Sequence, residues 1–461
     1  MPSKSGPESV SNLIFPTAAT SLSETLSSLK RSALSISNRL KSVSHDAEFV
    51  QSVASAWKLP LVANERCGGW YIHPSRRGIE GENGKRLGGS AYFKSTDGHT
   101  GEWAFSQRRL NLQVLDVVGR AKGCIIVDST RRGKSMPDAL SKTVPIWCAV
   151  MNRVLYPDKS DAHGLHTPPQ VVSRSEHAQI EARLDGFVRQ LQELSLNLEE
   201  LRGTLAKPMR PVWVTADSEI PEDIPEFEDA YPVVLCTASR RVPGGEVSEG
   251  GYVQGAGDDS EGWGHGLTSA LYWEHKDLLM STDEEDLPHL IEGIIAESRA
   301  QSDRSPEVQI KPTTWLSVGT LDTVRSAEDS HFDGVIYCSE ESDQSILSKL
   351  SKRSLHLECG ENKLGSRDLR RELPKISDFF QKQSPFEHLI VCCDSGKDIS
   401  IGVALAVLCL YADSQGKIIS HNQTNMNKSF IRQRLSWIMS SYPEANPSRS
   451  TLNSVNSFLM S

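Results

Sequence analysis

Two cysteines, two aspartates, two serines, a glycine and a lysine lie together in residues 392–400, close to the C-terminal end of the sequence. The apolar residues 389–391 predict a buried strand before this stretch, and a helix is expected from about residue 400. A tight turn from a strand into a helix directs backbone N–H groups and the positive end of the helix dipole toward one point. We therefore expect a phosphate site; the alternative is an ordinary connection without a ligand. The candidate phosphate ligands are Cys393, Ser395, Gly396, Lys397, Ile399 and Ser400.

The spacing of this loop resembles the phosphate loop of cysteine-dependent dual-specificity phosphatases, His-Cys-x-x-Gly-x-x-Arg-Ser. Cys393 falls at the position of the nucleophile, but Cys392 replaces the histidine and Ile399 replaces the arginine. That arginine grips the phosphoryl oxygens with two parallel hydrogen bonds. The resemblance therefore implies a loop that still holds phosphate but has lost cysteine-phosphatase catalysis.

A second candidate anion loop follows the apolar residues 124–127, which predict a buried strand ending at Asp128. The turn after it contains a glycine and three cations, which are suited to phosphate groups. Its predicted phosphate ligands are Arg131, Arg132 and Lys134.

Carboxylates near this loop and in a glycine-rich stretch at 250–268 are candidates for a metal site. Oxygen ligands are those that Mg²⁺ prefers, usually with several waters retained. We expect Asp128, Asp258 and Asp259 to hold Mg²⁺ through water. For the glycine-rich stretch the alternative is a surface loop with exposed acids.

Charge is distributed unevenly along the 461 residues, whose net charge is −9. Residues 65–142 contain fourteen Lys or Arg and eight acidic residues, so this segment is basic within an acidic protein. Such a segment can bind a phosphate backbone, although an evenly charged solvated surface is the alternative. The candidate RNA-binding residues are Arg76, Arg77, Lys85, Arg86, Arg108 and Arg109.

The nine cysteines are scattered and form no Cys-x-x-Cys pair with a matching second pair. Structural zinc and a disulfide framework are therefore not expected, and a reducing cytosol or nucleus fits best. Of these two compartments we expect the cytoplasm. No apolar run approaches ~20 residues and no secretory signal is visible at the N-terminus, so neither a membrane partner nor export is expected.

The pattern of elements predicts an α/β protein with two folded domains. Residues 1–20 are rich in Ser, Pro and Thr and are expected to be disordered. A helix is expected from Ser21 to Val43, and a second short helix from Asp46 to Val53. We place the first domain at 21–305 and the second at 306–461. In the second domain we expect strands at 315–318, 334–338, 355–357 and 388–391, and helices at 367–380, 400–410, 428–439 and 452–459.

Five stretches together resemble the initiator tRNA phosphoribosyltransferases of fungi and plants. They are 64–71, 92–111, 128–134, 253–259 and 393–398. The resemblance implies a family-specific N-terminal α/β domain followed by an α/β domain similar to dual-specificity phosphatases. It also implies transfer of 5-phosphoribosyl from phosphoribosyl pyrophosphate, with Mg²⁺, to the 2′-hydroxyl of the purine at position 64 of initiator methionyl tRNA. This modification would prevent use of the tRNA in elongation; no DNA partner is expected.

Such a transfer needs a base or an ordered hydrogen-bond partner for the acceptor hydroxyl. The candidate catalytic residues are Asp394 and Asp398 in the phosphate loop and His99, a loop histidine near Asp97. A turn-capping role is the alternative for His99. The alternative function is a non-catalytic RNA-binding protein with an inactive phosphatase-like module, and a less favoured one is an active phosphatase that uses Cys393.

Overall fold

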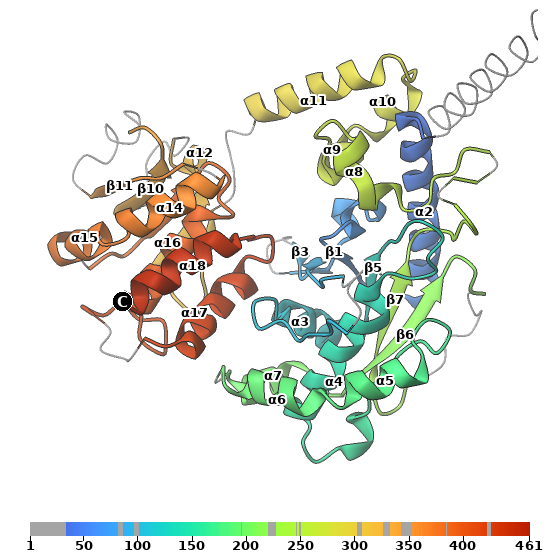
Figure 1. Cartoon of the computed structure of the whole chain (residues 1–461), viewed down its shortest axis with the longest axis horizontal. Helices are drawn as coiled ribbons and strands as arrows, with labels where there is room; N and C mark the ends of the chain where they lie inside the picture. The colour runs from blue at the N-terminus through green and yellow to red at the C-terminus, as the bar shows by residue number, and fades with distance from the viewer. Residues whose placement is uncertain are drawn as a thin grey trace, which may run out of the picture.

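The chain builds two mainly parallel sheets, one from its first 240 residues and one from its last 155 (Figure 1). The computed structural model describes residues 34–461 except for a set of short segments. These segments are 82–85, 96–100, 195, 220–226, 246, 249, 302–306, 326–331, 343–352, 361, 384 and 422–425. The predicted disorder of residues 1–20, the start of the first helix, His99 and Lys85 all lie outside the described residues.

The first sheet has the strand order β4-β1-β5-β7-β6, and all its neighbours are parallel. The short strands β2 (Ile79–Glu80) and β3 (Arg86–Leu87) pair separately as an antiparallel hairpin. The sheet's strands are β1 (Leu61–Asn64), β4 (Ser90–Ala91), β5 (Cys124–Asp128), β6 (Met209–Thr215) and β7 (Tyr231–Thr237). Because β1 and β5 are parallel neighbours, the residues that follow both strands meet at one edge of the sheet.

Alternate residues of each strand enter two separate cores, because successive strand side chains point to opposite faces. Ile126 packs on one face and Ile125 on the other. The Ile126 face is covered by α3 (Leu112–Ala121), α4 (Val144–Leu155) and α6 (Leu184–Gln192), with α5 (Arg174–Glu181) and α7 (Leu198–Thr204) beside them. The Ile125 face is covered by α2 (Ile36–Trp57), the short η2 (Gly68–Tyr71), α8 (Ser260–Trp263), α9 (Ser269–Glu274), α10 (Lys276–Ser281) and α11 (Leu287–Gln301).

The second sheet has the order β11-β10-β12-β9-β8, and only β8 is antiparallel to its neighbour. Its central strand, β12, ends in the predicted phosphate loop. The strands are β8 (Val308–Gln309), β9 (Leu316–Thr320), β10 (Gly334–Ser339), β11 (Ser354–Glu358) and β12 (Leu389–Cys393). One face packs on α14 (Asn362–Glu372), α15 (Lys375–Gln383), α16 (Ile399–Tyr411), α17 (Lys428–Ser441) and α18 (Arg449–Leu459), and the other on α12 (Leu321–Arg325).

Helix α16 is buried on all sides, and every one of its residues from Ile399 to Tyr411 is inaccessible to solvent or nearly so. A helix that is apolar all round is typical of the core of a layered protein. It lies between the sheet and the pair α17 and α18, so the phosphate loop enters a helix that cannot move independently of the core.

The α/β class and the positions of the strands in the second sheet are confirmed. Two helix predictions are wrong in their boundaries. The break expected between Val43 and Asp46 is absent, because α2 runs without interruption from Ile36 to Trp57 and both residues are buried along it. The single helix expected over 367–380 is two helices, since the chain turns at Leu373 and Pro374, and proline lacks the N–H that would continue the first helix.

Within the described part of the chain, no helix is long and apolar enough to cross a membrane. All nine cysteines are buried free thiols.

Two helical glycines offer a matched test of this packing. A Cβ on Gly402 of α16 would lie 2.5 Å from Cγ2 of Thr451 in α18, whereas a Cβ on Gly293 of α11 would meet nothing within 4 Å. We expect Gly402→Ala to lower the free energy of unfolding by about 1–3 kcal/mol through overpacking. Gly293→Ala should raise it by about 0.5–1 kcal/mol, because alanine loses less backbone entropy in a helix. Urea unfolding followed by circular dichroism would measure both, and equal midpoints for the two variants would contradict the packing described.

Candidate functional site

The loop after β12 has the form that the sequence predicts for an anion site. Gly396 has a left-handed backbone with φ of +65°, and its N–H donates to the carbonyl of Cys393. The loop leads directly into the N-terminus of α16, where the helix dipole supplies partial positive charge. A Cβ at Gly396 would lie 3.0 Å from the carbonyl oxygen of Gly319, so the turn requires both the left-handed conformation and the missing side chain.

Cys393 lies at the floor of this loop and is buried. Its Sγ is 3.2 Å from the hydroxyl of Ser400 and 3.5 Å from the backbone nitrogen of the same residue. Ile399, where the phosphatase motif has arginine, is the first residue of α16, and its side chain is 1% exposed within the core. Only the backbone of Ile399 can therefore contribute to an anion site.

Asp398 occupies the N-cap position of α16 but makes no capping hydrogen bond there. Its Oδ1 instead accepts from the backbone N–H of Ser448 at 2.8 Å and from the hydroxyl of Thr451 at 2.6 Å, at the start of α18. N-cap side chains normally accept from the first helical N–H groups. Because this carboxylate turns away, it does not compete with an anion for the N-terminus of α16.

Lys397 and Asp394 are the exposed charged residues of the loop. The Lys397 ammonium pairs with Glu444 at 3.0 Å, and both side chains are about half exposed. An ion pair of this kind contributes little to stability. An incoming phosphate can therefore replace Glu444 as the partner of Lys397 at small cost.

Two arginines of the first domain hold the segment 443–448, which joins α17 to α18 and lies against the loop. Arg108 Nη2 donates to the carbonyl of Pro447 at 2.8 Å. Arg109 donates to the carbonyl of Pro443 at 2.9 Å and to the side-chain oxygen of Asn446 at 3.1 Å. The N–H of Asn446 in turn donates to the carbonyl of Lys397 at 2.8 Å. The first domain therefore supports the phosphate loop through this segment.

Burial lowers the pKa of both guanidinium groups. The neighbouring charge of Arg108 adds to this effect and brings the pKa of Arg109 to about 10, so that it remains charged at neutral pH. The nearby Tyr92 and the carboxylate of Asp398 partly oppose the decrease in the pKa of Arg108. Arg109 also lies over the ring of Tyr92, at 4.6 Å from its centroid.

The second cluster forms around Asp128, which is completely buried where β5 ends. One carboxylate oxygen accepts from Asn64 at 2.8 Å and from Arg66 Nε at 3.2 Å. The other accepts from the thiol of Cys67 at 3.0 Å and from the N–H of Ser129 at 2.8 Å. Four donors satisfy the carboxylate, as a buried charge requires.

The charges of this cluster are strongly coupled. Burial alone lowers the pKa of Arg66, but the carboxylates of Asp128 and Asp258 outweigh it and raise the pKa above its ordinary value. Burial and the same two carboxylates raise the pKa of the Cys67 thiol, which therefore stays protonated and can donate to Asp128. Cys67 is a structural donor here rather than a nucleophile.

Asp258 and Asp259 extend the cluster as ion-pair partners. Asp258 pairs with Arg66 at 2.9 Å and lies 3.7 Å from Arg131, while Asp259 pairs with Arg131 and lies 3.7 Å from Arg39. In the described residues, no group of three or more His, Cys, Asp or Glu is arranged to hold a metal ion. This arrangement does not fit direct binding of Mg²⁺ to the three predicted carboxylates, and their role through water stays a prediction.

The basic loop after β5 is held in a defined shape. Arg132 and Gly133 both have left-handed backbones, and Gln254 accepts from the N–H of Gly133 at 3.0 Å and donates to the carbonyl of Lys134 at 2.7 Å. Arg132 and Lys134 are exposed, whereas Arg131 is half-buried. The two exposed cations are therefore the better placed of the three to meet an anion.

A charged path connects the two clusters. Glu444, the partner of Lys397, acts electrostatically on Arg77 of the first domain. Arg77 lies 4.0 Å from Glu65, and Glu65 directly precedes Arg66, which binds Asp128. Charged residues of both domains therefore lie between the two predicted anion loops, which are 265 residues apart in the sequence.

Several of the arginines predicted to bind RNA form hydrogen bonds within the protein. Arg77 donates to the carbonyls of Gly69 and Ile72, and Arg86 donates to those of Arg77 and Gly78. Arg108 and Arg109 hold the segment 443–448, whereas Arg76 is exposed. No contact with RNA is tested by these observations, so the RNA-binding role of these residues stays a prediction.

Sequence reasoning missed Asn64, Arg66 and Cys67 as partners of Asp128, and Glu444 as the partner of Lys397. One signal could have indicated the contact with Asn64: this residue ends a strand, and the C-terminal ends of parallel strands lie at the same edge of a sheet. The order of the strands, which makes β1 and β5 neighbours, could not be read from the sequence.

Comparison with known proteins decides the family. The family model described as Rit1 N-terminal domain matches residues 29–296, and the model described as Rit1 DUSP-like domain matches residues 353–459. The chain belongs to the Rit1 family. Its second domain is therefore a Rit1 DUSP-like domain, as the phosphate-loop spacing predicts.

Members of this family resemble the chain over nearly its whole length. The tRNA A64-2′-O-ribosylphosphate transferase of Saccharomyces cerevisiae is 33% identical over 505 aligned positions, which cover 95% of each chain. An uncharacterised protein of Schizosaccharomyces pombe is 36% identical, covering 92% of this chain and 94% of its own. Among solved structures, the Yvh1 phosphatase domain from Chaetomium thermophilum matches 33% of this chain and 95% of its own, with 19% identity and a TM-score of 0.26.

The hold of Arg109 on the segment 443–448 can be tested by amide hydrogen exchange. Arg109→Ala removes both of its hydrogen bonds to this segment, so we expect faster exchange in peptides covering 443–448 and 394–398. Peptides from α16 should exchange as in the wild type, because that helix is buried in its own domain. Arg76→Ala is the matched control, since Arg76 is exposed, and it should change neither set of peptides. Unchanged exchange in Arg109→Ala would contradict this support.

Proposed function

We propose that this chain transfers 5-phosphoribosyl from phosphoribosyl pyrophosphate to the 2′-hydroxyl of the purine at position 64 of initiator methionyl tRNA. The modified tRNA would then be excluded from elongation. The observation that carries the proposal is the likeness to the Saccharomyces cerevisiae tRNA A64-2′-O-ribosylphosphate transferase, which extends over 95% of both chains and therefore includes both domains.

The phosphate loop supplies a place for the donor. We assign residues 393–400 to a donor phosphate, the 5-phosphate, because backbone N–H groups and the dipole of α16 favour a dianion at this point. Lys397 adds a positive charge at the rim of the loop once phosphate replaces Glu444. The absence of the phosphatase arginine is compatible with this role. The 5-phosphate is bound but does not react, so the loop does not need to stabilise a phosphoryl-transfer transition state.

The transfer itself takes place at the anomeric carbon of the ribose. The bond from this carbon to the pyrophosphate oxygen breaks, a bond to the tRNA 2′-oxygen forms, and the hydroxyl proton goes to a base. Of the two candidate aspartates in the loop, Asp394 is exposed to an incoming hydroxyl, whereas Asp398 is half-buried and accepts hydrogen bonds from Ser448 and Thr451. We therefore assign the base to Asp394 and a positioning role to Asp398.

The leaving pyrophosphate needs positive charge. We assign this role to Arg132 and Lys134, the exposed cations of the loop after β5. Mg²⁺ remains part of the proposal as an ion that neutralises pyrophosphate; since the described residues form no metal cluster, its ligands would come mainly from the donor and water. The charged residues Glu444, Arg77 and Glu65, which lie between this loop and the phosphate loop, support a site that uses both.

The acceptor stem is A-form RNA, which proteins recognise through its shape, its phosphates and its 2′-hydroxyls. The exposed Arg76 of the first domain is suited to such contacts. A protein that acts on initiator tRNA before elongation would work in the cytoplasm, and we propose that location.

The decisive experiment incubates the full chain with initiator tRNA and labelled phosphoribosyl pyrophosphate, with and without Mg²⁺, followed by nucleoside analysis. We expect label at position 64 as a ribosyl phosphate on the 2′-oxygen. Cys393→Ser should retain most of the transfer, because the transfer uses no thiol nucleophile and serine keeps a small hydrogen-bonding group at this position. RNA binding without transfer would favour the inactive RNA-binding alternative. Hydrolysis of a generic phosphoester that is lost in Cys393→Ser would favour a phosphatase.

The role of Lys397 can be measured separately. Lys397→Ala removes a charge-assisted hydrogen bond to the donor phosphate, so we expect the KM for phosphoribosyl pyrophosphate to rise about tenfold or more. The KM for tRNA should change little. Glu444→Gln is the matched variant: it removes the competing partner of Lys397, so the donor KM should fall or stay the same. An unchanged donor KM in Lys397→Ala would remove the assignment of the loop.

A further inference from the structure

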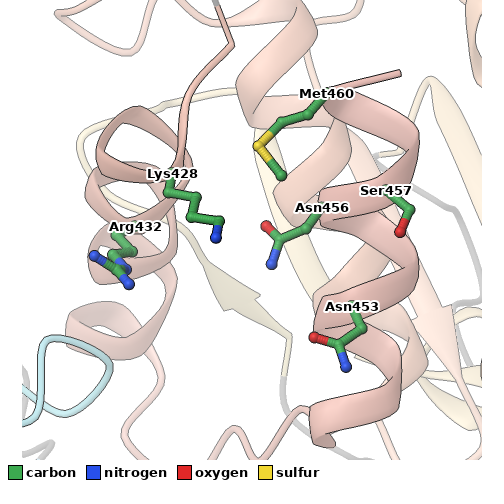
Figure 2. A pocket seen from close by; sticks show the side chains of 6 residues that line it. All are labelled: Lys428, Arg432, Asn453, Asn456, Ser457 and Met460. Atoms are coloured by element: carbon green, nitrogen blue, oxygen red, sulfur yellow. The ribbon is translucent and has the colours of Figure 1, made fainter.

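A polar groove lies between α17 and α18 in the second domain, outside the two clusters described above (Figure 2). Its volume is about 510 Å³ and it is open to solvent on one side. Figure 2 shows Lys428 on α17 extending toward Asn456 on α18, with Arg432 farther along α17. The lining residues are Lys428, Arg432, Asn453, Asn456, Ser457 and Met460.

The groove is basic within an acidic protein. Neither α17 nor α18 contains an acidic residue. From residue 414 to the end of the chain there are five Lys or Arg and a single acid, Glu444, although the net charge of the whole chain is −9. Lys428 and Arg432 are both exposed, and within the described part of the chain neither forms an ion pair. The undescribed residues next to them, 422–425, are Asn-Gln-Thr-Asn and add no acid. The local potential therefore favours a polyanion.

The other wall of the groove offers neutral hydrogen-bonding groups. Asn456 lies half-buried on α18 and points toward Lys428 across the gap (Figure 2). Asn453 and Ser457 lie on the same helix, one turn or less away. An amide both donates and accepts, so it can bind a sugar hydroxyl beside a phosphate held by a cation. Phosphates next to 2′-hydroxyls are the features by which proteins recognise A-form RNA.

The groove lies farther along α18 than the phosphate loop. Thr451, at the start of this helix, binds Asp398 of the loop. At about 1.5 Å per residue, Asn456 lies roughly 8 Å and Met460 roughly 14 Å farther along the helix axis. A nucleic acid backbone that passes the phosphate loop can therefore reach the groove within a few nucleotides.

We propose that the groove between α17 and α18 binds the phosphate backbone of the substrate tRNA, with Lys428 and Arg432 on the phosphates and Asn456 on a 2′-hydroxyl. This inference rests on the proposed function for the identity of the RNA. It assigns to the phosphatase-like domain a share of tRNA binding, in addition to holding the donor.

The test measures binding of unmodified initiator tRNA to the full chain over a range of salt concentrations, without donor. The double variant Lys428→Ala/Arg432→Ala should weaken binding on the order of tenfold and reduce the slope of log affinity against log salt by about two, one for each lost phosphate contact. The matched control is Lys382→Ala, which removes an exposed cation from α15 in the same domain. It should leave the affinity and the slope as in the wild type.

A second variant tests the contact with the sugar. Asn456→Ala should reduce the preference for a T-stem RNA hairpin over the DNA hairpin of the same sequence, with little change in salt slope, because only RNA has the 2′-hydroxyl. Circular dichroism and melting temperature would verify that each variant is folded.

The inference is overturned if the double variant binds tRNA with the affinity and salt slope of the wild type. It is also overturned if the double variant loses binding of an acidic peptide or inorganic phosphate but keeps that of tRNA. The readout is binding, so it is independent of the proposed reaction. Loss of tRNA binding in the double variant supports the proposed groove even if no transfer is detected. If the double variant is active in transfer with an unchanged KM for tRNA, the proposed groove is refuted while the proposed function stands.

Discussion

The hydrogen bonds from Arg108 and Arg109 to the segment 443–448 are the constraint on which the arrangement of both domains depends. They join residues more than 330 positions apart in the sequence, and they end on backbone carbonyls and one amide oxygen rather than on carboxylates. A guanidinium that is bound in this way keeps its full charge beside a phosphate loop, whereas a carboxylate partner would cancel it. The bonds therefore hold the domains together and leave the interface attractive to anions.

Three groups of the phosphate loop that could interfere with an anion are held elsewhere by their neighbours. Asp398 turns to α18, Ile399 enters the core, and the carbonyl of Lys397 is bound by Asn446. The helix behind the loop is buried all round, so the direction of its dipole is set by packing. A loop arranged in this way binds an anion without paying for reorganisation, which is the main benefit of a preformed site.

Much of the second domain could be predicted from the sequence, because strands β9 to β12 and helices α16 to α18 are short apolar or periodic runs between clear turns. The prediction of anion sites at the two loops also came from local spacing, and it stays a prediction. What could not be predicted depends on contacts between distant residues. Arg66 reaches Asp128 because β1 and β5 are neighbours in the sheet. The binding of the segment 443–448 by Arg108 and Arg109 depends on how the two domains pack together. Local patterns carry no information on either pairing, and the same holds for the turn of Asp398 toward Ser448.

The buried thiols have a practical consequence. Because all nine cysteines are inaccessible, a maleimide dye should react with a single cysteine introduced on the surface far faster than with the native ones. One such position in each domain would make the chain a reporter of the separation between its two halves. Fluorescence energy transfer between the two dyes could then follow, in real time, whether the halves move when tRNA is added.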